Sequence, residues 1–257
     1  MAKISVTILT KNSSKYIKQC LEALQSFDEI IILDNGSTDD TLKIAQHYPH
    51  VKIVTHDFIG FGPLKNMALT HASNEWILSV DSDEIFSKAL VDEILNLSLE
   101  KHTIYSILRD NYYGDQHIDG CGWQNDYVQR LFNKNITQFS DKQVHESLII
   151  KPHLTIKKLT HRFKHYSYDN TSHLIDKMQK YSSLYAQEHK NTKTSSPSKA
   201  FLRGTYTFIK NYWFQKGFLC GYAGFLISLT NASTTYYKYI KLYEENKKST
   251  DRNIDEN

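Results

Sequence analysis

The sequence predicts an α/β fold in which helices cover both faces of a mostly parallel sheet. In the first hundred residues, apolar runs of strand length alternate with segments whose apolar residues recur at helical spacing. That order is typical of a parallel sheet covered by helices. The last third of the chain reads as helical, basic and aromatic, which predicts a further C-terminal region. With 40% hydrophobic and 23% charged residues among 257, the chain is expected to bury a core.

Four apolar runs predict the strands of the parallel sheet. They lie at residues 3–10, 29–34, 51–56 and 76–80. Four helices are expected after these strands, at residues 16–24, 38–47, 64–72 and 88–99. The first helix carries its apolar residues on one face, namely Ile17, Cys20, Leu21 and Leu24. For the second helix, Ser37 or Thr38 is the expected N-cap, with Asp39 and Asp40 in the first turn.

The pattern changes after residue 100. Strands are predicted at 104–112, 127–132 and 144–150, with loops rich in Gly, Asp and Asn between them. From residue 171 the chain reads as helical, with a joint at 191–198. We therefore expect a first domain at 1–170, a helical C-terminal region at 171–243 and a polar tail at 244–257.

Composition limits the classes of protein to which the chain can belong. The N-terminus enters a strand pattern without a long apolar segment, so no signal peptide is expected. No apolar run approaches the roughly 18 to 20 residues of a membrane span. The three cysteines, Cys20, Cys121 and Cys220, have no paired spacing. That spacing favours a reducing cytoplasm over a disulfide framework or a cysteine-based zinc site.

The C-terminal region has an unusual charge distribution. Glu188 is the last acid before Glu244, and the 55 residues between them carry eight basic residues and thirteen aromatic ones. Basic residues beside an aromatic face describe an interfacial helix attracted to anionic lipid headgroups. The alternative is that the aromatic residues pack this region onto the first domain. Nucleic acid is not the expected partner, because no known binding motif is visible and the N-terminal half is not basic.

An acidic motif, Asp81-Ser82-Asp83-Glu84, follows the strand at 76–80. Mg²⁺ and Mn²⁺ prefer oxygen ligands, and Mg²⁺ usually binds one or two carboxylates together with substrate phosphates. The alternative is a turn or a helix cap. Thr10 to Asn12 and Asp34 to Gly36 follow other predicted strands, so all three motifs are expected at the same edge of the sheet.

Two further residues are candidates for binding a nucleotide. Asp34 could accept a hydrogen bond from a ribose hydroxyl or a base N–H, and the alternative is an Asx turn. Lys65, near a predicted helix start, could neutralise a phosphate, and the alternative is a solvated surface lysine. The chain has neither a P-loop nor the G-x-G-x-x-G dinucleotide fingerprint.

Taken together, these motifs resemble the GT-A domain of inverting family 2 glycosyltransferases. The resemblance rests first on residues 5–12, 32–39 and 81–84, in that order and at that spacing. Further segments are similar to the lipopolysaccharide-core β-1,4-glucosyltransferases of Gram-negative bacteria, the WaaE/LgtF-like group. These segments are residues 60–66, 111–113, 122–123, 126–132, 144–146 and 165–168.

The resemblance implies roles for the residues at the donor site. Thr10, Asn12 and Asp34 would contact the nucleotide, while Asp81 and Asp83 would bind the ribose and a divalent cation on the diphosphate. Such a cation, Mg²⁺ or Mn²⁺, acts as a Lewis acid on the leaving diphosphate. Such sites often add a C-terminal histidine ligand. Here the candidate is His165, with a capped or core histidine as the alternative.

Inversion by direct displacement requires a general base that deprotonates the acceptor hydroxyl, and a carboxylate is the ordinary choice. Glu146 is the first candidate, Asp126 the second and Asp141 the third. Glu146 could instead form a structural ion pair with Arg130 or Lys142. Arg130 could bind donor phosphate through its planar guanidinium. Trp123 could stack on an acceptor sugar, or it could be a core residue.

The function implied by the resemblance is metal-assisted transfer of glucose from UDP-glucose to heptose of a lipopolysaccharide inner core. Residues 1–100 would then bind the donor, and residues 101–170 the acceptor. The acceptor would be a lipid-linked oligosaccharide, so we expect a cytoplasmic enzyme at the inner face of the plasma membrane, in peripheral contact with anionic lipid. Two alternatives remain: transfer to a protein side chain or a capsule or lipid glycan, and a non-catalytic partner protein that binds nucleotide sugars.

Overall fold

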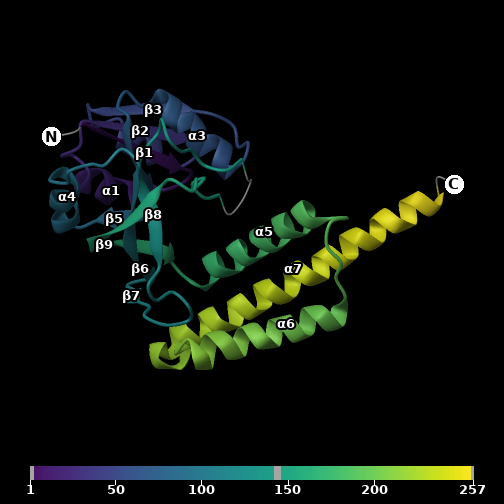
Figure 1. The fold of residues 1–257 in the computed structure, drawn as a ribbon. Coiled ribbons are helices and arrows are strands. Elements are labelled where there is room, and N and C mark those ends of the chain that lie inside the picture. The colour runs from purple at the N-terminus through teal and green to yellow at the C-terminus, as the bar shows by residue number, and fades with distance from the viewer. Residues whose placement is uncertain (1–2, 142–145, 256–257) are drawn as a thin grey trace. The chain divides into compact units, whose positions relative to one another are not determined.

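The structure, a computed structural model, describes residues 3–141 and 146–255. It divides into two compact units (Figure 1). The N-terminal unit comprises residues 1–110 and 125–166, and the C-terminal unit comprises residues 111–124 and 167–257. Residues 111–124 therefore group with the C-terminal helices, although they precede part of the N-terminal unit in the chain.

The first half of the N-terminal unit alternates strands and helices, as the sequence predicts. The strands are β1 (Ile4–Thr10), β2 (Glu29–Asp34), β3 (Val51–Thr55), β4 (Trp76–Asp81) and β5 (Glu84–Phe86). The helices are α1 (Ile17–Ala23), α2 (Thr41–Ala45), α3 (Phe61–His71) and α4 (Lys88–Leu95). The remaining strands are β6 (Thr103–Tyr113), β7 (Gln116–His117), β8 (Tyr127–Asn133) and β9 (Thr155–Tyr168).

The strands form one mixed sheet with the order β3-β2-β1-β4-β8-β6-β9-β5, and β7 pairs with β6. Strands β3, β2, β1 and β4 are mutually parallel. Thr10 lies opposite Asp34, and Leu9 lies opposite Asp81. The predicted convergence of the strand-end motifs at one edge of the sheet is therefore confirmed.

Both faces of the parallel strands are covered, because successive side chains of a strand point to opposite faces. Ile30 and Ile32 pack in one apolar cluster with residues of α1 and α4. Ile31 and Leu33 contribute to clusters on the other face, which include residues of α3. This explains why β2 reads as a continuous apolar run and not as an alternating one.

Two local predictions are wrong. Helix α2 begins at Thr41, not at residue 38, and its N-cap position is Asp40 without a side-chain cap. The physical reason is Asp39, whose carboxylate accepts hydrogen bonds from the backbone N–H and the hydroxyl of Thr41 and from the N–H of Ser14. The strand predicted at 144–150 is also absent from its described part, where Leu148 forms only an isolated bridge with Phe139. Residues 144 and 145 lie outside the described residues.

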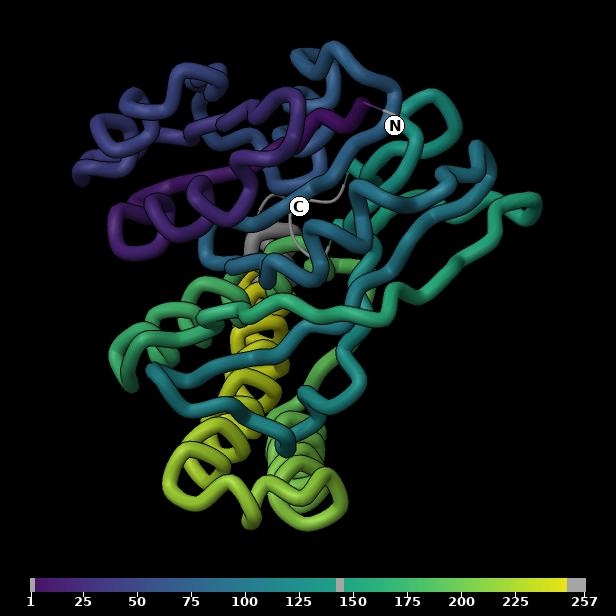
Figure 2. Tube along the Cα trace, turned by 90° about the vertical axis from the view of Figure 1, so that its left-hand side faces the viewer, coloured from purple at the N-terminus to yellow at the C-terminus, as the bar shows by residue number. Residues whose placement is uncertain are grey.

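The C-terminal unit contains the helices α5 (Thr171–His189), α6 (Pro197–Ile209) and α7 (Gly221–Asp255). A π-helical turn, η1 (Lys210–Phe214), and a 3₁₀ turn, η2 (Gly217–Cys220), connect α6 to α7. Helices α6 and α7 lie side by side in both views (Figures 1 and 2). Helix α6 has a Ser196 N-cap and Pro197 at its first position, both of which favour helix initiation there. Among the described residues, no helix is long and apolar enough to cross a membrane.

Candidate active site

The loops after β1, β2 and β4 are cross-linked by side chains. Asn12 lies in the left-handed region, with φ of 51°, and its side-chain oxygen accepts from the N–H of Thr38 at 2.7 Å. The N–H of Asn12 donates to the Ser37 hydroxyl at 2.9 Å. The hydroxyls of Ser13 and Ser82 lie 2.7 Å apart, which connects the first loop to the acidic motif. These bonds hold the three loops at the edge of the sheet in one arrangement.

Asp34 is buried at the end of β2 and forms the Asx turn that was the alternative to a nucleotide contact. Its Oδ2 accepts from the N–H groups of Gly36 and Ser37 at 3.0 and 2.9 Å, and its Oδ1 accepts from the Ser37 hydroxyl. Beside it, Thr10 Oγ1 and Asn35 Oδ1 are buried and have no hydrogen-bond partner among the described residues. Unsatisfied buried polar atoms are rare in native proteins and indicate a missing partner. A bound ligand at this edge would supply one.

Asp81 lies between two buried cations. Its carboxylate contacts Lys65 Nζ at 3.1 Å and an Arg130 guanidinium nitrogen at 2.6 Å. Antiparallel pairing of β8 with β4 brings Arg130 to this position, since Leu131 lies opposite Leu78. Burial opposes ionisation of Asp81, but the charges of Arg130 and Lys65 outweigh it and hold the pKa of Asp81 well below its ordinary value.

Glu84 is completely buried and shares Arg130 with Asp81. Its other oxygen accepts from the backbone N–H of Asp81 at 3.1 Å. Burial, the largest influence, raises the pKa of Glu84, and the Arg130 charge opposes that shift. The ion pairs in turn raise the pKa of Arg130 despite its burial, so this guanidinium stays positive.

Glu146 joins the same cluster through Lys65, whose Nζ lies 2.9 Å from Glu146 Oε1. Lys65 is 7% exposed and is therefore not the solvated surface lysine that the sequence left open. Burial disfavours its charge, yet the carboxylates of Asp81 and Glu146 raise the pKa of Lys65 above its ordinary value. Arg130 pairs with Asp81 and Glu84 rather than with Glu146, and Lys142 lies outside the described residues.

The segment before Glu146 is anchored on α3. The Asn66 side chain accepts from the N–H of Phe139 at 2.8 Å and donates to its carbonyl at 2.9 Å. Lys65 Nζ also lies 5.3 Å from the centre of the Phe139 ring. These contacts from two adjacent residues of α3 hold Phe139 in place. Asp141, the third candidate base, is exposed and lies 3.5 Å from the Asn66 amide.

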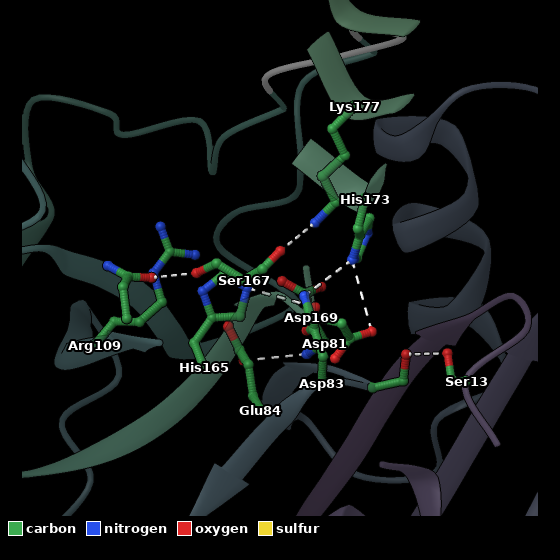
Figure 3. A network of polar contacts seen from close by, with 12 residues as sticks. Ser13, Asp81, Asp83, Glu84, Arg109, His165, Ser167, Asp169, His173 and Lys177 are labelled. Atoms are coloured by element: carbon green, nitrogen blue, oxygen red, sulfur yellow. Dashed lines mark hydrogen bonds and ion pairs between the residues drawn. The ribbon is translucent and has the colours of Figure 1, made fainter. Parts of the chain in front are cut away.

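Asp83 and His165 face each other in the N-terminal unit (Figure 3). Antiparallel pairing of β5 with β9 sets His165 opposite Glu84, and His165 Nε2 lies 3.6 Å from Asp83 Oδ2. The backbone carbonyl of Asp83 accepts from the N–H of Tyr166 at 3.0 Å. A carboxylate oxygen and an imidazole nitrogen at this separation fit as two ligands of one divalent cation. The described residues contain no cluster of three or more such ligands, so a cation here would need ligands from substrate or water.

The described contacts of two further predicted site residues, Asp126 and Trp123, are with other side chains. Asp126 is paired with Arg109, whose Nε and a terminal nitrogen lie 2.9 and 2.7 Å from Asp126 Oδ2. Trp123 belongs to the C-terminal unit, where it stacks on Tyr168 with ring centres 5.9 Å apart. It also packs against the apolar cluster that contains Ile118 and Ile227. These contacts are the core packing that was the alternative to a sugar-binding role for Trp123.

Sequence reasoning assigned no role to three residues of the site. Glu84 could have been recognised as a site residue from the sequence, because it directly follows the D-x-D motif. Asn66 lies in a segment quoted for the resemblance, but nothing in the sequence distinguishes its anchoring role. Nothing in the sequence distinguishes Arg109, since basic residues are ordinary in partly exposed strands.

Comparisons with known proteins address the family to which the chain belongs. The family model described as "Glycosyl transferase family 2" matches residues 5–151. An uncharacterized glycosyltransferase of Rickettsia typhi is 30% identical over 268 residues, covering 99% of this chain and 90% of the relative. The lipopolysaccharide core biosynthesis glycosyltransferase LpsC of Rhizobium meliloti is 25% identical over 266 residues, covering 98% and 96%.

Two solved structures show more distant similarity. Staphylococcus aureus TarS 1-349 in complex with UDP-GlcNAc is 16% identical with a TM-score of 0.48, covering 98% of this chain and 92% of that one. Mycobacterium tuberculosis glucosyl-3-phosphoglycerate synthase with Mn²⁺, UDP and phosphoglyceric acid is 23% identical with a TM-score of 0.36, covering 44% and 43%. Family membership rests on the family model and the sequence relatives. The chain belongs to glycosyltransferase family 2, and its α/β region has a GT-A-like fold.

Proposed function

We propose that this glycosyltransferase moves glucose from UDP-glucose to a heptose of a lipopolysaccharide inner core, with inversion at the anomeric carbon. The observation that carries the proposal is the cluster at the end of β4, where Lys65 holds Glu146 beside the D-x-D motif. The name of the LpsC relative supports the core acceptor. The motif segments shared with the WaaE/LgtF-like group support the donor sugar and the linkage.

The donor would be held by residues at the sheet edge. Thr10, Asn12 and Asp34 line the position proposed for the nucleoside, and the unsatisfied atoms of Thr10 and Asn35 would find partners there. Lys65 and Arg130 carry the positive charge proposed to face the diphosphate. The carboxylates of Asp81, Glu84 and Glu146 outnumber these two cations, which favours a further cation at the site.

Asp83 and His165 would hold that cation, Mg²⁺ or Mn²⁺. When bound, it would supply Lewis-acid stabilisation of the charge on the leaving diphosphate. Glu146 would accept the proton of the acceptor hydroxyl while that oxygen bonds to the anomeric carbon. The bond from this carbon to the diphosphate oxygen breaks in the same step, and UDP departs with the electron pair. Asp126, paired with Arg109, is the second candidate base.

The test is turnover with UDP-glucose, Mg²⁺ or Mn²⁺ and a heptose-terminated lipid-linked acceptor, with product mass and linkage determined by NMR. Glu146→Gln should lower kcat by about 10²- to 10⁴-fold, because it removes the proton acceptor. UDP binding measured by calorimetry should persist in that variant. Asp126→Asn is the matched control, and a larger loss there would reassign the base.

Asp83→Asn tests the metal role separately. It should weaken Mn²⁺-dependent binding of UDP in calorimetry as well as turnover, and unchanged turnover would show that the metal role is wrong. Transfer only to a protein side chain or a capsule glycan would replace the proposed acceptor. Absence of any uridine-nucleotide binding with metal present would favour a non-catalytic partner protein.

A further inference from the structure

Helix α6 buries small residues and exposes large ones. The buried residues of α6 are Ala200 and Gly204. A Cβ atom at Gly204 would lie 3.2 Å from Tyr236 Cβ and 3.3 Å from the carbonyl oxygen of Ala232. The two backbones therefore approach closely, as at helix interfaces inside membranes, where small residues are enriched. In a water-soluble helix pair, the large apolar residues would form this interface.

Many large apolar residues of α6 and α7 instead form two exposed stripes. The first comprises Leu202, Tyr206 and Ile209 of α6, and the second comprises Tyr222, Phe225 and Leu229 of α7. Their spacing of three or four residues places each set on one face of its helix. The turns η1 and η2 add further exposed apolar residues, among them Trp213, Phe214 at 77% and Leu219 at 68%. Exposed apolar surface of this extent marks an interaction site.

Basic residues flank the apolar stripe of α6. At about 100° per residue, Lys199, Arg203 and Lys210 fall beside that stripe. Lys199, Arg203 and Lys238 all lie close to the Tyr239 ring, at 5.5, 5.6 and 5.5 Å from its centre. Burial, together with the like charges of Arg203 and Lys193, lowers the pKa of Lys238.

No carboxylate lies between Glu188 and Glu244 in the sequence, and none contacts Lys199, Arg203 or Lys238 within the described ranges. Cations crowded around one ring repel each other, so the cluster favours an anionic partner. Near this cluster, an apolar groove of about 330 Å³ runs between α6 and α7 and is lined in part by Phe201, Phe208 and Tyr236.

We propose that the exposed α6–α7 face, with the turns η1 and η2, docks on the surface of an anionic phospholipid bilayer. The aromatic and aliphatic stripes enter the interfacial layer, and Lys199, Arg203 and Lys210, which lie beside the stripe of α6, bind headgroup phosphates. The helices lie on the membrane and do not cross it, in line with the lack of a spanning helix in the part of the chain described. The inference goes beyond the proposed function and does not depend on sugar transfer.

Charge distinguishes this partner from a second copy of the chain. A symmetric dimer through the same face would bring the basic residues of one copy against those of the other. That arrangement has no compensating carboxylates in residues 189–243. A bilayer containing anionic lipid supplies both the apolar medium and the opposite charge.

The experiment is binding of the full chain to vesicles, without donor or acceptor, so that its failure leaves the proposed transfer untouched. We expect co-sedimentation with phosphatidylcholine vesicles that contain phosphatidylglycerol, and much weaker binding to phosphatidylcholine alone. Brominated lipid should quench tryptophan fluorescence in the wild type, and Trp213→Phe should lose that quenching. The other tryptophans, Trp76 and Trp123, are the internal reference.

Two sets of variants separate the contributions of positive charge and of apolar side chains to vesicle binding. The triple substitution of Lys199, Arg203 and Lys210 to Gln should weaken binding about 100-fold, at about 1 kcal/mol for each charge. Lys43, Lys52 and Lys101 to Gln is the matched control, because it removes the same charge from exposed positions of the N-terminal unit. Phe214→Ser with Leu219→Ser should weaken binding at least about 10-fold, whereas Ile156→Ser, another exposed apolar site, should not.

Three outcomes would overturn the proposal. The first is an equal loss of vesicle binding in the two triple variants that remove positive charge. The second is a stable dimer by light scattering in which Trp213 is protected from brominated lipid. The third is binding to nucleic acid, but not to vesicles, that the basic triple abolishes. Circular dichroism of each variant confirms that the fold is retained.

Discussion

The N-terminal unit and helix α6 of the C-terminal unit place large apolar side chains differently. In the N-terminal unit, large apolar residues such as Ile32 and Leu78 are fully buried. In helix α6 the buried residues are Ala200 and Gly204, while Leu202 is 66% exposed, and Tyr222 of α7 is 72% exposed. A helix that turns its large apolar residues outward has a medium other than water as its partner.

The basic side chains of the two units also differ in the partners that they contact. In the N-terminal unit, Lys65 and Arg130 are buried and each contacts two carboxylates. In the C-terminal unit, Lys199, Arg203 and Lys238 gather around one tyrosine with no carboxylate contact in the described chain. Paired buried charges set the geometry of a site, whereas gathered unpaired charges attract an external anion.

The largest effect on stability is expected from Arg130→Met. It leaves Asp81 and the fully buried Glu84 without their shared cation, so the free energy of unfolding should fall by about 3–5 kcal/mol. Urea denaturation measures this. Arg109→Met is the matched control, because its partner Asp126 is partly exposed and the loss should stay below about 1 kcal/mol. Equal losses in the two variants would contradict the assignment of Arg130 to a buried network.

Leucine-to-alanine substitutions compare the apolar residues of the two units directly. Leu78→Ala should lower the free energy of unfolding by about 2–5 kcal/mol, because it leaves a cavity in the core. Leu219→Ala should change it by less than about 0.5 kcal/mol, since this side chain is 68% exposed. A large cost at Leu219 in urea denaturation would mean that its side chain is covered in solution.

The small-residue interface of α6 and α7 can be tested by enlarging it. Gly204→Leu should destabilise the protein by about 1–3 kcal/mol, because a Cβ atom there already approaches Tyr236 and Ala232 closely. Thr205→Leu places the same side chain at the neighbouring exposed position and should change stability by less than about 0.5 kcal/mol. If thermal unfolding is the same for both variants, the close approach of the helices is not important for stability.

The smallest effect concerns pH and Asp39. Burial opposes ionisation, but the hydrogen bonds from Thr41 and Ser14 together outweigh it and lower the pKa of Asp39 from 3.8 to about 2. Its stabilising contribution is therefore present above about pH 4 and is lost as the pH falls through 2. Asp39→Asn should lower the free energy of unfolding near neutral pH by less than about 1 kcal/mol, because Asp39 is exposed.

The same pair of proteins checks the sign of this effect. The difference between wild type and Asp39→Asn in urea denaturation should shrink as the pH approaches 2. A difference that grows on acidification would contradict the assignment.

Local patterns predicted much of the fold. The apolar runs at 29–34 and 76–80 correspond to β2 and β4 almost residue for residue, because buried parallel strands need continuous apolar sequence. The start of α2 could not be predicted in this way. Ser37, Thr38 and Asp39 are all good cap residues. The hydrogen bond from the N–H of Ser14, in another loop, to Asp39 determines where the helix begins.

The candidate active site, too, could be predicted from the sequence only in part. The D-x-D motif was visible in the sequence, and its position at the sheet edge followed from the order of strands and helices. The ion pairs were not visible. The alternative to a catalytic role for Glu146 was an ion pair with Arg130 or Lys142, but its described partner is Lys65 on α3. Nothing along the chain indicates which cation a carboxylate meets once the strands pair.

The sequence alone was enough to predict the α/β class, the shared edge for Thr10, Asp34 and Asp81, and the acid-free basic and aromatic region. These features depend on periodicity and composition, which are properties of neighbouring residues. Which charges pair, and which apolar residues stay exposed, depends on segments that are distant in the chain. Antiparallel pairing of β8 with β4 brings Arg130 to Asp81, and close contact at Gly204 turns Leu202 and Tyr206 outward.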